Sequence, residues 1–441
     1  MKKVAPLILF SLGSVALIVI LSGFFPKYHG MLTLILFFLL MDAYLWSSVR
    51  RSFYALRHAF RIPLVALFWM PLGVLVSLVI LGTFYSFLEW NIFFRTGILS
   101  LFFITYFSLF IPITFLVLAD AERLVRAGIR KIRGVRPFFP RHRRRPILLT
   151  GWITGGVAWT VLLLGMVFWV FSFKVHTAYV TMPGLPASFN GYRVVVLSDI
   201  HLGSWTCREK LAEAVEKVNE LKPDVIFFTG DMFTFATADG EGFQPILGKL
   251  KARRGVYCIL GNHDYGDYVR WPSTYAWQKN LEQVSTFYGR MGWNLLLNRT
   301  MIIREGSDSI AVAGVENWSA NKRFQRRGDV KKALAGYETV PCKILLSHDP
   351  SHWDSIVSKQ YPGIGLTLSG HTHGGQFGID MENCQWSPIS FTYKHWGGLY
   401  SIVNPATGLK QYIYVNRGLG TVGYAGRVGM PPEITLIVLS K

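Results

Sequence analysis

The 441-residue chain is too long for one ordinary soluble domain and long enough for two units of different kinds. Its hydrophobic content of 51% and mean hydropathy of +0.31 are unusual for a soluble enzyme and normal for a protein that lies partly in a membrane. A net charge of +20 is also typical of nucleic-acid binders, but residues 1–173 carry 18 Lys and Arg against 4 Asp and Glu, placed between apolar segments. Membrane orientation explains this charge better, so we do not expect nucleic acid as a partner.

Five apolar segments near the start of the chain are each long enough to cross a bilayer, which takes about 20 residues. They cover residues 4–25, 31–49, 63–85, 96–118 and 147–173. The first follows two lysines, but its apolar run is too long for a cleaved signal peptide, and we interpret it as a retained helix. We therefore predict a multi-pass transmembrane region over residues 1–173 with about five helices.

The charges of the connecting loops predict the orientation. Four arginines lie between residues 50 and 61, and ten basic residues lie between the fourth and fifth spans, whereas the loop between the third and fourth spans holds only Glu89 and Arg95. Basic loops stay cytoplasmic. With five spans, everything after residue 173 is then predicted to lie outside the cytoplasm, attached to the cell membrane.

The remaining segment, 174–441, repeats one pattern: a short run rich in β-branched residues, then a turn with side chains of the kind that bind metals. The runs and the residues that follow them are 193–198 with Asp199 and His201; 224–229 with Asp231; 255–260 with Asn262, His263 and Asp264; 343–346 with His348; and 363–369 with His371 and His373. Segment 208–221 has apolar residues at helical spacing and is predicted to be a crossover helix between the first two strands. Near-continuous apolar strands indicate a sheet covered on both faces, and ligands bind at the carboxyl ends of such strands.

The residue types in these turns suit divalent cations. Asp, Asn and His offer oxygen and nitrogen donors for Mn, Fe, Zn or Mg. In Asp199-x-His201, and in the similar pair at the fifth run, an extended backbone would point both side chains the same way. Asp231 could bridge two metals about 3.5–4 Å apart with its two oxygens.

Two further features of the turns indicate specific roles for their residues. Gly230, Gly261 and Gly370 come just before the candidate ligands, where we expect sharp turns. His263 followed by Asp264 fits a general acid whose imidazole is oriented by a carboxylate.

In this order, the five motifs resemble the calcineurin-like metallophosphoesterase superfamily, whose pattern is D-x-H, GD, GNH[D/E], H and GHxH. The resemblance has no departure at a ligand position between Asp199 and His373. The string 370–376 and the tail segments 415–421 and 432–436 look like the membrane-associated branch, which includes bacterial phosphodiesterases and animal transmembrane proteins with a metallophosphoesterase domain.

The resemblance implies a four-layer α/β/β/α sandwich of two mixed sheets over residues 174–441, with two divalent metal ions as cofactors. It implies that His263 contacts the phosphate and protonates the leaving group. It also implies three sets of metal ligands: Asp199, His201 and His373 for one metal; Asn262, His348 and His371 for the other; and Asp231 as the bridge.

We therefore expect a membrane-anchored hydrolase of phosphate mono- or diesters, with the bilayer as a partner and a lipid or envelope polymer as a candidate substrate. The alternative is a sensor or scaffold that binds a phosphate ligand and signals through the helices. The intact pair of His263 and Asp264 favours the enzyme, because a binder needs no proton donor.

Some features stay open at this stage. Arg417 and Arg427 could bind a substrate phosphate or be solvated at the surface. The aromatic-rich segment 265–298 could shape a substrate site, rest on the membrane interface or simply be packed. The four cysteines could form disulfides outside the cytoplasm, although Cys258 and Cys342 fit as small buried hydrophobes.

Overall fold

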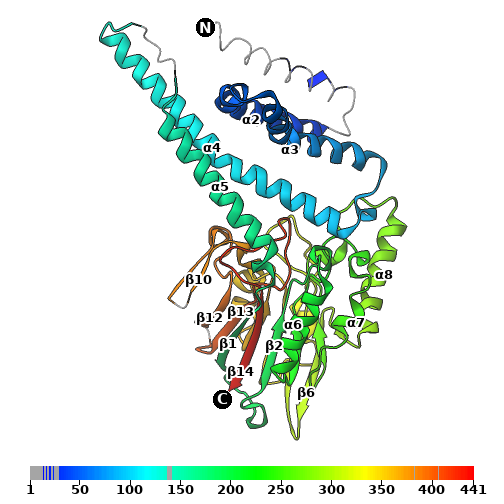
Figure 1. Ribbon diagram of the computed structural model, residues 1–441. Coiled ribbons are helices and arrows are strands. Elements are labelled where there is room, and N and C mark those ends of the chain that lie inside the picture. Colours follow the sequence, from blue (N-terminus) through cyan, green and yellow to red (C-terminus); the bar gives the residue numbers. More distant parts are fainter. Residues whose placement is uncertain are drawn as a thin grey trace. The chain divides into compact units, whose positions relative to one another are not determined.

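The chain forms two compact units in a computed structural model that describes residues 29–136, 142–381, 383–405 and 407–441, with five single positions before residue 29 (Figure 1). One unit comprises Met1–Trp90 and Ile98–Leu163, and the other comprises Asn91–Gly97 and Leu164–Lys441. We call them the membrane unit and the catalytic unit. The catalytic unit thus contains the first turn of a helix whose remainder belongs to the membrane unit.

Four helices among the described residues are long and apolar enough to cross a membrane. They are α2 (His29–Tyr54), α3 (His58–Phe84), α4 (Ile92–Ile132) and α5 (Arg145–Val167), the last continued by a short 3-10 turn, Trp169–Phe171. They correspond to the last four predicted spans. The first predicted span, 4–25, lies outside the described residues apart from isolated positions.

One buried acidic group inside the membrane unit has a hydrogen-bond partner. On α2 the Asp42 carboxylate is buried and accepts a hydrogen bond of 2.9 Å from the Tyr106 hydroxyl of α4. Phe38 and Leu75 pack around the same tyrosine. The hydrogen bond offsets part of the cost of placing a carboxylate within an apolar bundle.

The catalytic unit contains two six-stranded mixed sheets, which confirms the predicted α/β fold. The first sheet has the order β1 (Lys174–Thr181), β14 (Glu433–Ser440), β2 (Arg193–Leu197), β3 (Val225–Phe228), β4 (Val256–Cys258) and β5 (Asn294–Leu295). The second has the order β12 (Gly398–Val403), β13 (Lys410–Val415), β9 (Leu366–Ser369), β8 (Lys343–Leu346), β7 (Asp308–Gly314) and β6 (Arg299–Glu305). A small hairpin, β10 (Ile379–Met381) and β11 (Cys384–Trp386), lies outside both sheets.

Three hydrophobic cores separate four layers. Alternate residues of β2 show why its sequence is apolar throughout: Val194 and Val196 lie in the core between the sheets, and Val195 lies in the core under the helices. That outer core is covered by α6 (Arg208–Glu220), the predicted crossover helix, and by α8 (Thr274–Arg290). The third core lies between the second sheet and α9 (Val330–Leu334). Full burial of each such valine stabilises the fold by roughly 1.5–3 kcal/mol.

The parallel strands bring the predicted motifs to one place. β2, β3 and β4 run parallel in the first sheet, and β8 and β9 run parallel in the second. Because their carboxyl ends lie at one edge of the sandwich, the five turns that follow these strands meet there.

Candidate metal centre

All seven predicted metal ligands gather at this edge. Six are almost completely buried, and the His371 side chain is only 8% exposed. The acidic and imidazole donors form groups in which one ligand atom from each residue lies within 4.8 Å of the others. Such burial of acids and histidines needs compensating partners, and a metal ion is one such partner.

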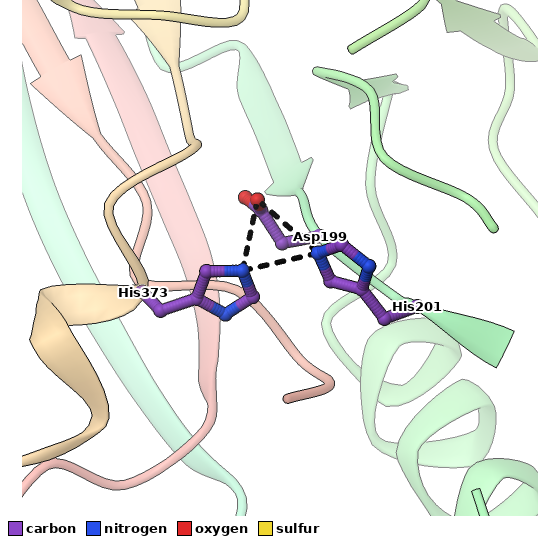
Figure 2. Close-up of side chains that lie close together, drawn as sticks. All are labelled: Asp199, His201 and His373. Carbon is purple, nitrogen blue, oxygen red and sulfur yellow. Dashed lines mark hydrogen bonds and ion pairs between the residues drawn. The ribbon is translucent and has the colours of Figure 1, made fainter. Parts of the chain in front are cut away.

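The first cluster consists of Asp199, His201 and His373 (Figure 2). The Nε2 atoms of the two histidines lie 3.1 Å apart. The Asp199 Oδ1 atom is 3.4 Å from the His373 Nε2 atom and 3.9 Å from the His201 Nε2 atom. Three donor atoms thus face a common point, as expected for ligands of one cation.

The second cluster consists of Asp231, His348 and His371. The His348 Nε2 atom lies 3.1 Å from the Asp231 Oδ2 atom and 3.3 Å from the His371 Nδ1 atom. The same Oδ2 atom is 3.6 Å from the His201 Nε2 atom of the first cluster. The Asp231 Oδ1 atom instead accepts a hydrogen bond from the backbone N–H of His263. The clusters therefore share one oxygen, whereas the sequence led us to expect that both oxygens would serve.

Asn262 supplies an oxygen suited to a metal. Its amide nitrogen donates a 2.6 Å hydrogen bond to the Tyr268 hydroxyl. Its Oδ1 atom is buried and has no hydrogen-bond partner in the described protein. A buried carbonyl oxygen without a donor is costly, and a cation would satisfy it. The donor set therefore fits divalent metal ions.

The ligand backbones are not extended, so the predicted reason for the paired side-chain directions is wrong. Asp199, His201, Asp231, His371 and His373 all have positive φ angles, between 47° and 71°. This left-handed conformation is unfavourable for residues other than glycine and persists only where surrounding structure imposes it. Strain of this kind concentrates at functional sites, and here it falls on five of the predicted ligands.

The glycines at the turns act in two ways. Gly230 has a φ of +102° and provides the sharp turn expected of it. At Gly261 a Cβ would lie 2.2 Å from the Asp231 Oδ1 atom, and at Gly370 it would lie 1.8 Å from the Ser198 hydroxyl oxygen. These two glycines are required because a ligand-bearing loop passes too close for any side chain.

Asp264 does not orient the His263 imidazole, so that part of the prediction is wrong. Its carboxylate is buried and accepts hydrogen bonds from four backbone N–H groups. These groups belong to Asp231, Met232, Phe233 and Gly261. Asp264 therefore holds the turn that carries Asp231 in place.

The His263 ring is oriented by other groups. Its Nδ1 atom lies 2.7 Å from the Thr234 carbonyl oxygen, which can only accept, so Nδ1 carries the proton. The ring stacks on Tyr268, with centroids 4.0 Å apart, and lies edge-on to His201 at 4.8 Å. The Nε2 atom is thereby left for a ligand of the site.

Several partners of the ligands carried no sequence motif. The Tyr393 hydroxyl lies 2.8 Å from the His371 Nε2 atom, and Asp349 lies 3.5 Å from that nitrogen. The Thr229 carbonyl oxygen holds the His348 Nδ1 atom at 2.8 Å. Such outer partners fix the tautomer and orientation of metal-binding imidazoles. Only Asp349, adjacent to His348, and Tyr268, in the aromatic segment, had a signal in the sequence.

Electrostatics at the centre favour neutral imidazoles at His201 and His373 and an ionised carboxylate at Asp231. At His348, burial would lower the pKa of the imidazole, but Asp231 outweighs this effect and raises the pKa to about 10. Burial lowers the pKa of His201 to about 3 and that of His373 well below its ordinary value. Burial would raise the pKa of Asp231, but His348 and His263 outweigh it and hold this pKa well below its usual range. Metal binding requires neutral imidazole and ionised carboxylate, so His201, His373 and Asp231 already have the required protonation.

Arg417 and Arg427 are fully buried, so neither is solvated at the surface. Arg417 pairs with Glu433 at 2.7 Å. Arg427 donates to the backbone carbonyls of Arg417, Gly418 and Gly420, and at 3.3 Å to the His373 carbonyl oxygen. The four cysteines are unpaired, and Cys258 and Cys342 are buried as expected.

The fold and its clustered donors define a membrane-attached protein with an α/β domain built to bind divalent metal ions. Residues 192–375 match the family described as calcineurin-like phosphoesterase, and residues 27–168 match a probable calcineurin-like phosphoesterase transmembrane domain. The chain belongs to the calcineurin-like phosphoesterase family. Membership implies a hydrolase that uses divalent metals, and the second match confirms the membrane-associated branch.

Three relatives illustrate the range of similar proteins. The chain is 35% identical over 61% of its length to a zebrafish (Danio rerio) transmembrane protein with metallophosphoesterase domain, of which the match spans 57%. It is 32% identical over 58% of its length to the uncharacterized metallophosphoesterase YkuE of Bacillus subtilis, covering 82% of that protein. It is 30% identical over 58% of its length to the UDP-2,3-diacylglucosamine pyrophosphatase LpxG of Chlamydia trachomatis, covering 86%. The chain thus spans little more than half of the zebrafish relative.

Proposed function

We propose that this chain hydrolyses phosphate mono- or diesters with two divalent metal ions held at the edge of its two sheets. The observation that carries the proposal is the pair of buried donor clusters joined by the Asp231 Oδ2 atom. Asp199, His201 and His373 would hold one ion. Asn262, His348 and His371 would hold the other. Bound there, the ions would supply a water of lowered pKa and an electrostatic clamp on the phosphoryl oxygens.

The chain's own residues would bind and protonate the substrate. The Thr234 carbonyl accepts the Nδ1–H of His263, so Nε2 would carry the second proton of an imidazolium and donate it to the leaving oxygen. Tyr268 keeps the imidazole plane fixed by stacking on it. Asp264 would act indirectly, because its carboxylate holds the Asp231 turn by accepting hydrogen bonds from four backbone N–H groups.

We further propose that the substrate is a membrane lipid with a phosphate ester in its head group. A cavity of about 520 Å³ in the catalytic unit is lined mainly by apolar groups, among them Trp169, Met381, Val428 and Met430. Trp169 belongs to the turn that ends the candidate span α5, so one wall of the cavity comes from the end of a helix long and apolar enough to cross a membrane. Its floor includes Arg427, which is bonded to the His373 backbone. The cavity lies within the usual size range of about 300–1,000 Å³ for ligand pockets, and we propose that it receives an acyl chain of the substrate.

The orientation belongs to the same proposal. The basic loops before α3 and after α4 support a cytoplasmic location for one end of the bundle. The catalytic unit follows α5 at the other end and would work outside the cytoplasm. The name of the chlamydial relative, a diacylglucosamine pyrophosphatase, is consistent with an envelope lipid.

The test uses the full chain in detergent micelles with 4-nitrophenyl phosphate and bis(4-nitrophenyl) phosphate, with Mn²⁺, Zn²⁺ or chelator. Hydrolysis should need metal and should be lost in Asp231→Asn and His263→Ala. The exposed Arg254, which pairs with Glu305 at the end of β6, offers a control in Arg254→Gln, which should keep full activity. Absence of metal-dependent turnover on every ester would refute the proposed function.

The lipid substrate is tested separately with Met381→Asp in the cavity and Met301→Asp, an exposed methionine on β6, as the matched control. The cavity variant should lose turnover of a lipid phosphate ester in mixed micelles and keep turnover of the soluble chromogenic ester. Equal loss on both substrates, or full activity of the native chain on soluble nucleotides with none on lipids, would reject the lipid.

A further inference from the structure

The first turn of α4 is part of the catalytic unit. Residues Asn91–Gly97 belong to that unit, whereas α4 continues from Ile98 within the membrane unit. The turn is capped by Asn91, whose side-chain oxygen accepts a hydrogen bond from the Phe93 N–H at 2.9 Å. A membrane-spanning helix therefore begins inside the α/β domain.

Arg95 anchors this turn, and the sequence had suggested only a charge in a loop. Its side chain is 2% exposed, its Nη2 atom lies 2.6 Å from the Asp239 Oδ1 atom, and its guanidinium lies over the Phe235 ring at 4.8 Å. Two charges buried to this extent are stable only as a pair with further hydrogen bonds. Asp239 provides these bonds.

The second oxygen of Asp239 holds the loop that follows Asp231. Its Oδ2 atom accepts hydrogen bonds from the backbone N–H groups of Phe235 at 2.7 Å, Thr234 at 3.2 Å and Ala236 at 3.3 Å. Thr234 is the residue whose carbonyl oxygen orients His263. One carboxylate thus joins the α4 turn to the group that holds the proton-donating imidazole.

A second contact ties the same turn to a metal-ligand loop. The Thr96 hydroxyl donates a 2.9 Å hydrogen bond to the Gly203 carbonyl, two residues after His201. A Cβ at Gly203 would lie 2.7 Å from the Asp239 Oδ2 atom, so this glycine allows the loop and the carboxylate to meet. The first turn of α4 therefore contacts two of the loops that build the site.

We infer that Arg95 is a positioning residue for His263, acting through Asp239 and the Thr234 carbonyl. This inference rests on the proposed function, in which the leaving oxygen takes the proton of His263 Nε2 as its bond to phosphorus breaks. Water supplies hydroxide to phosphorus, and the proton that this water loses restores His263. Loss of Arg95 frees Asp239 and the Thr234 loop, so the imidazole is no longer aimed at the leaving oxygen. Proton donation in the catalytic unit then depends on how a membrane helix begins.

The experiment compares two esters of one class, with phenol and with 4-nitrophenol as leaving groups, in the full chain. Phenol needs a proton as it departs and 4-nitrophenol needs it much less. In Arg95→Gln, kcat for the phenyl ester should fall about 10-fold or more, as part of the roughly 10²–10⁴-fold that general acids contribute, and by less than about 3-fold for the nitrophenyl ester. KM and the bound Mn²⁺ per chain should stay unchanged, as should all values in the control Arg254→Gln.

Two further variants protect the test from a folding artefact. Arg95→Lys keeps the buried charge but not the planar fork, so it should fold and show the same leaving-group dependence with a smaller loss. In a His263→Ala background, Arg95→Gln should cause no additional loss, because residues that act as one unit are not additive.

The inference is overturned if Arg95→Gln and Arg95→Lys lower kcat equally for the two esters, or if the Mn²⁺ content of both variants falls. It is also overturned if Arg95→Gln lowers kcat further in the His263→Ala background, or if neither Arg95 variant differs from the native chain. A native chain with no metal-dependent hydrolysis instead refutes the proposed function, and the positioning role with it. The two failures are therefore distinguishable.

Discussion

Replacement of Asp264 by asparagine tests whether this carboxylate holds the metal-site backbone. The Oδ2 atom accepts N–H groups of Asp231 and Gly261, each at 2.9 Å. The Oδ1 atom accepts N–H groups of Met232 at 2.8 Å and Phe233 at 3.2 Å. An asparagine has one oxygen and one NH₂, so at one end a donor would face two donors.

The expected loss follows from these four contacts. Burial raises the pKa of Asp264 to about 7, so the acceptor is charged above that pH. There, two hydrogen bonds to a charged acceptor disappear, each contributing about 1.5–3 kcal/mol, and the free energy of unfolding of the catalytic unit should fall by about 3–6 kcal/mol. This is a large part of the roughly 5–15 kcal/mol that stabilises a typical domain. The turn it holds contains Asp231 at a φ of 61°, which needs such support, so metal affinity should fall as well.

Denaturant unfolding followed by tryptophan fluorescence, together with Mn²⁺ bound per chain, measures both effects. Asp267→Asn, an exposed aspartate three residues further on, is the control and should change the unfolding free energy by no more than about 0.5 kcal/mol. If Asp264→Asn instead keeps its stability and metal content and loses only turnover, the carboxylate acts on His263. That result would refute the backbone role.

Three other predictions follow from buried or exposed groups. Burial would raise the pKa of Glu433, but Arg417 outweighs this effect and lowers the pKa in the folded protein. The ion pair therefore stabilises the fold fully above the ordinary carboxyl pKa of about 4.3. This stabilisation is lost as the pH falls through the lower pKa of the folded state. Glu433→Gln should therefore lower the unfolding free energy by about 3–5 kcal/mol at pH 7 and remove that acid dependence, as measured by unfolding at several pH values; equal acid dependence in both proteins would contradict this. Gly370→Ala should abolish Mn²⁺ binding, because its Cβ would lie 1.8 Å from the nearest side-chain oxygen, and normal metal content would show that the loop can move. Cys384, which is exposed, should react with a membrane-impermeant maleimide on intact cells, whereas a cysteine at position 133 in the basic loop should not; the reverse pattern would invert the orientation.

The sequence predicted strands covered on both faces and the convergence of the ligands because both follow from local rules, whereas the division into two sheets was implied by the family resemblance. An apolar strand of four to six residues needs cover on both faces, and parallel strands present their carboxyl ends at one edge. The turn residues Asp199, Asp231 and His348 follow such strands directly. These residues come together because the strands that precede them run parallel, and the order of strands along the chain already indicates this.

What could not be predicted depends on how short turns direct side chains. His263 and Asp264 are neighbours in sequence, which suggested a hydrogen bond between their side chains. They lie in a 3-10 turn, His263–Tyr265, where successive side chains point in different directions. The carboxylate therefore faces the Asp231 turn, and the carbonyl oxygen of residue 234 makes the hydrogen bond to the His263 imidazole that was expected of the carboxylate.

The buried arginines of the tail show why a basic residue near a phosphate site is ambiguous in sequence. Around Arg427 the chain is rich in glycine and forms no regular strand, and the carbonyls of residues 417, 418 and 420 accept from the Arg427 guanidinium. Of these three, the carbonyl of residue 418 also accepts the backbone N–H of Glu433 at the start of β14. Buried carbonyls need donors, and one guanidinium supplies several in a fixed plane. The glycines that suggested a loop open to substrate phosphate are thus the reason that an arginine is needed inside it. A cation close to a metal centre should be assigned to substrate only after the carbonyls of its own loop have been accounted for.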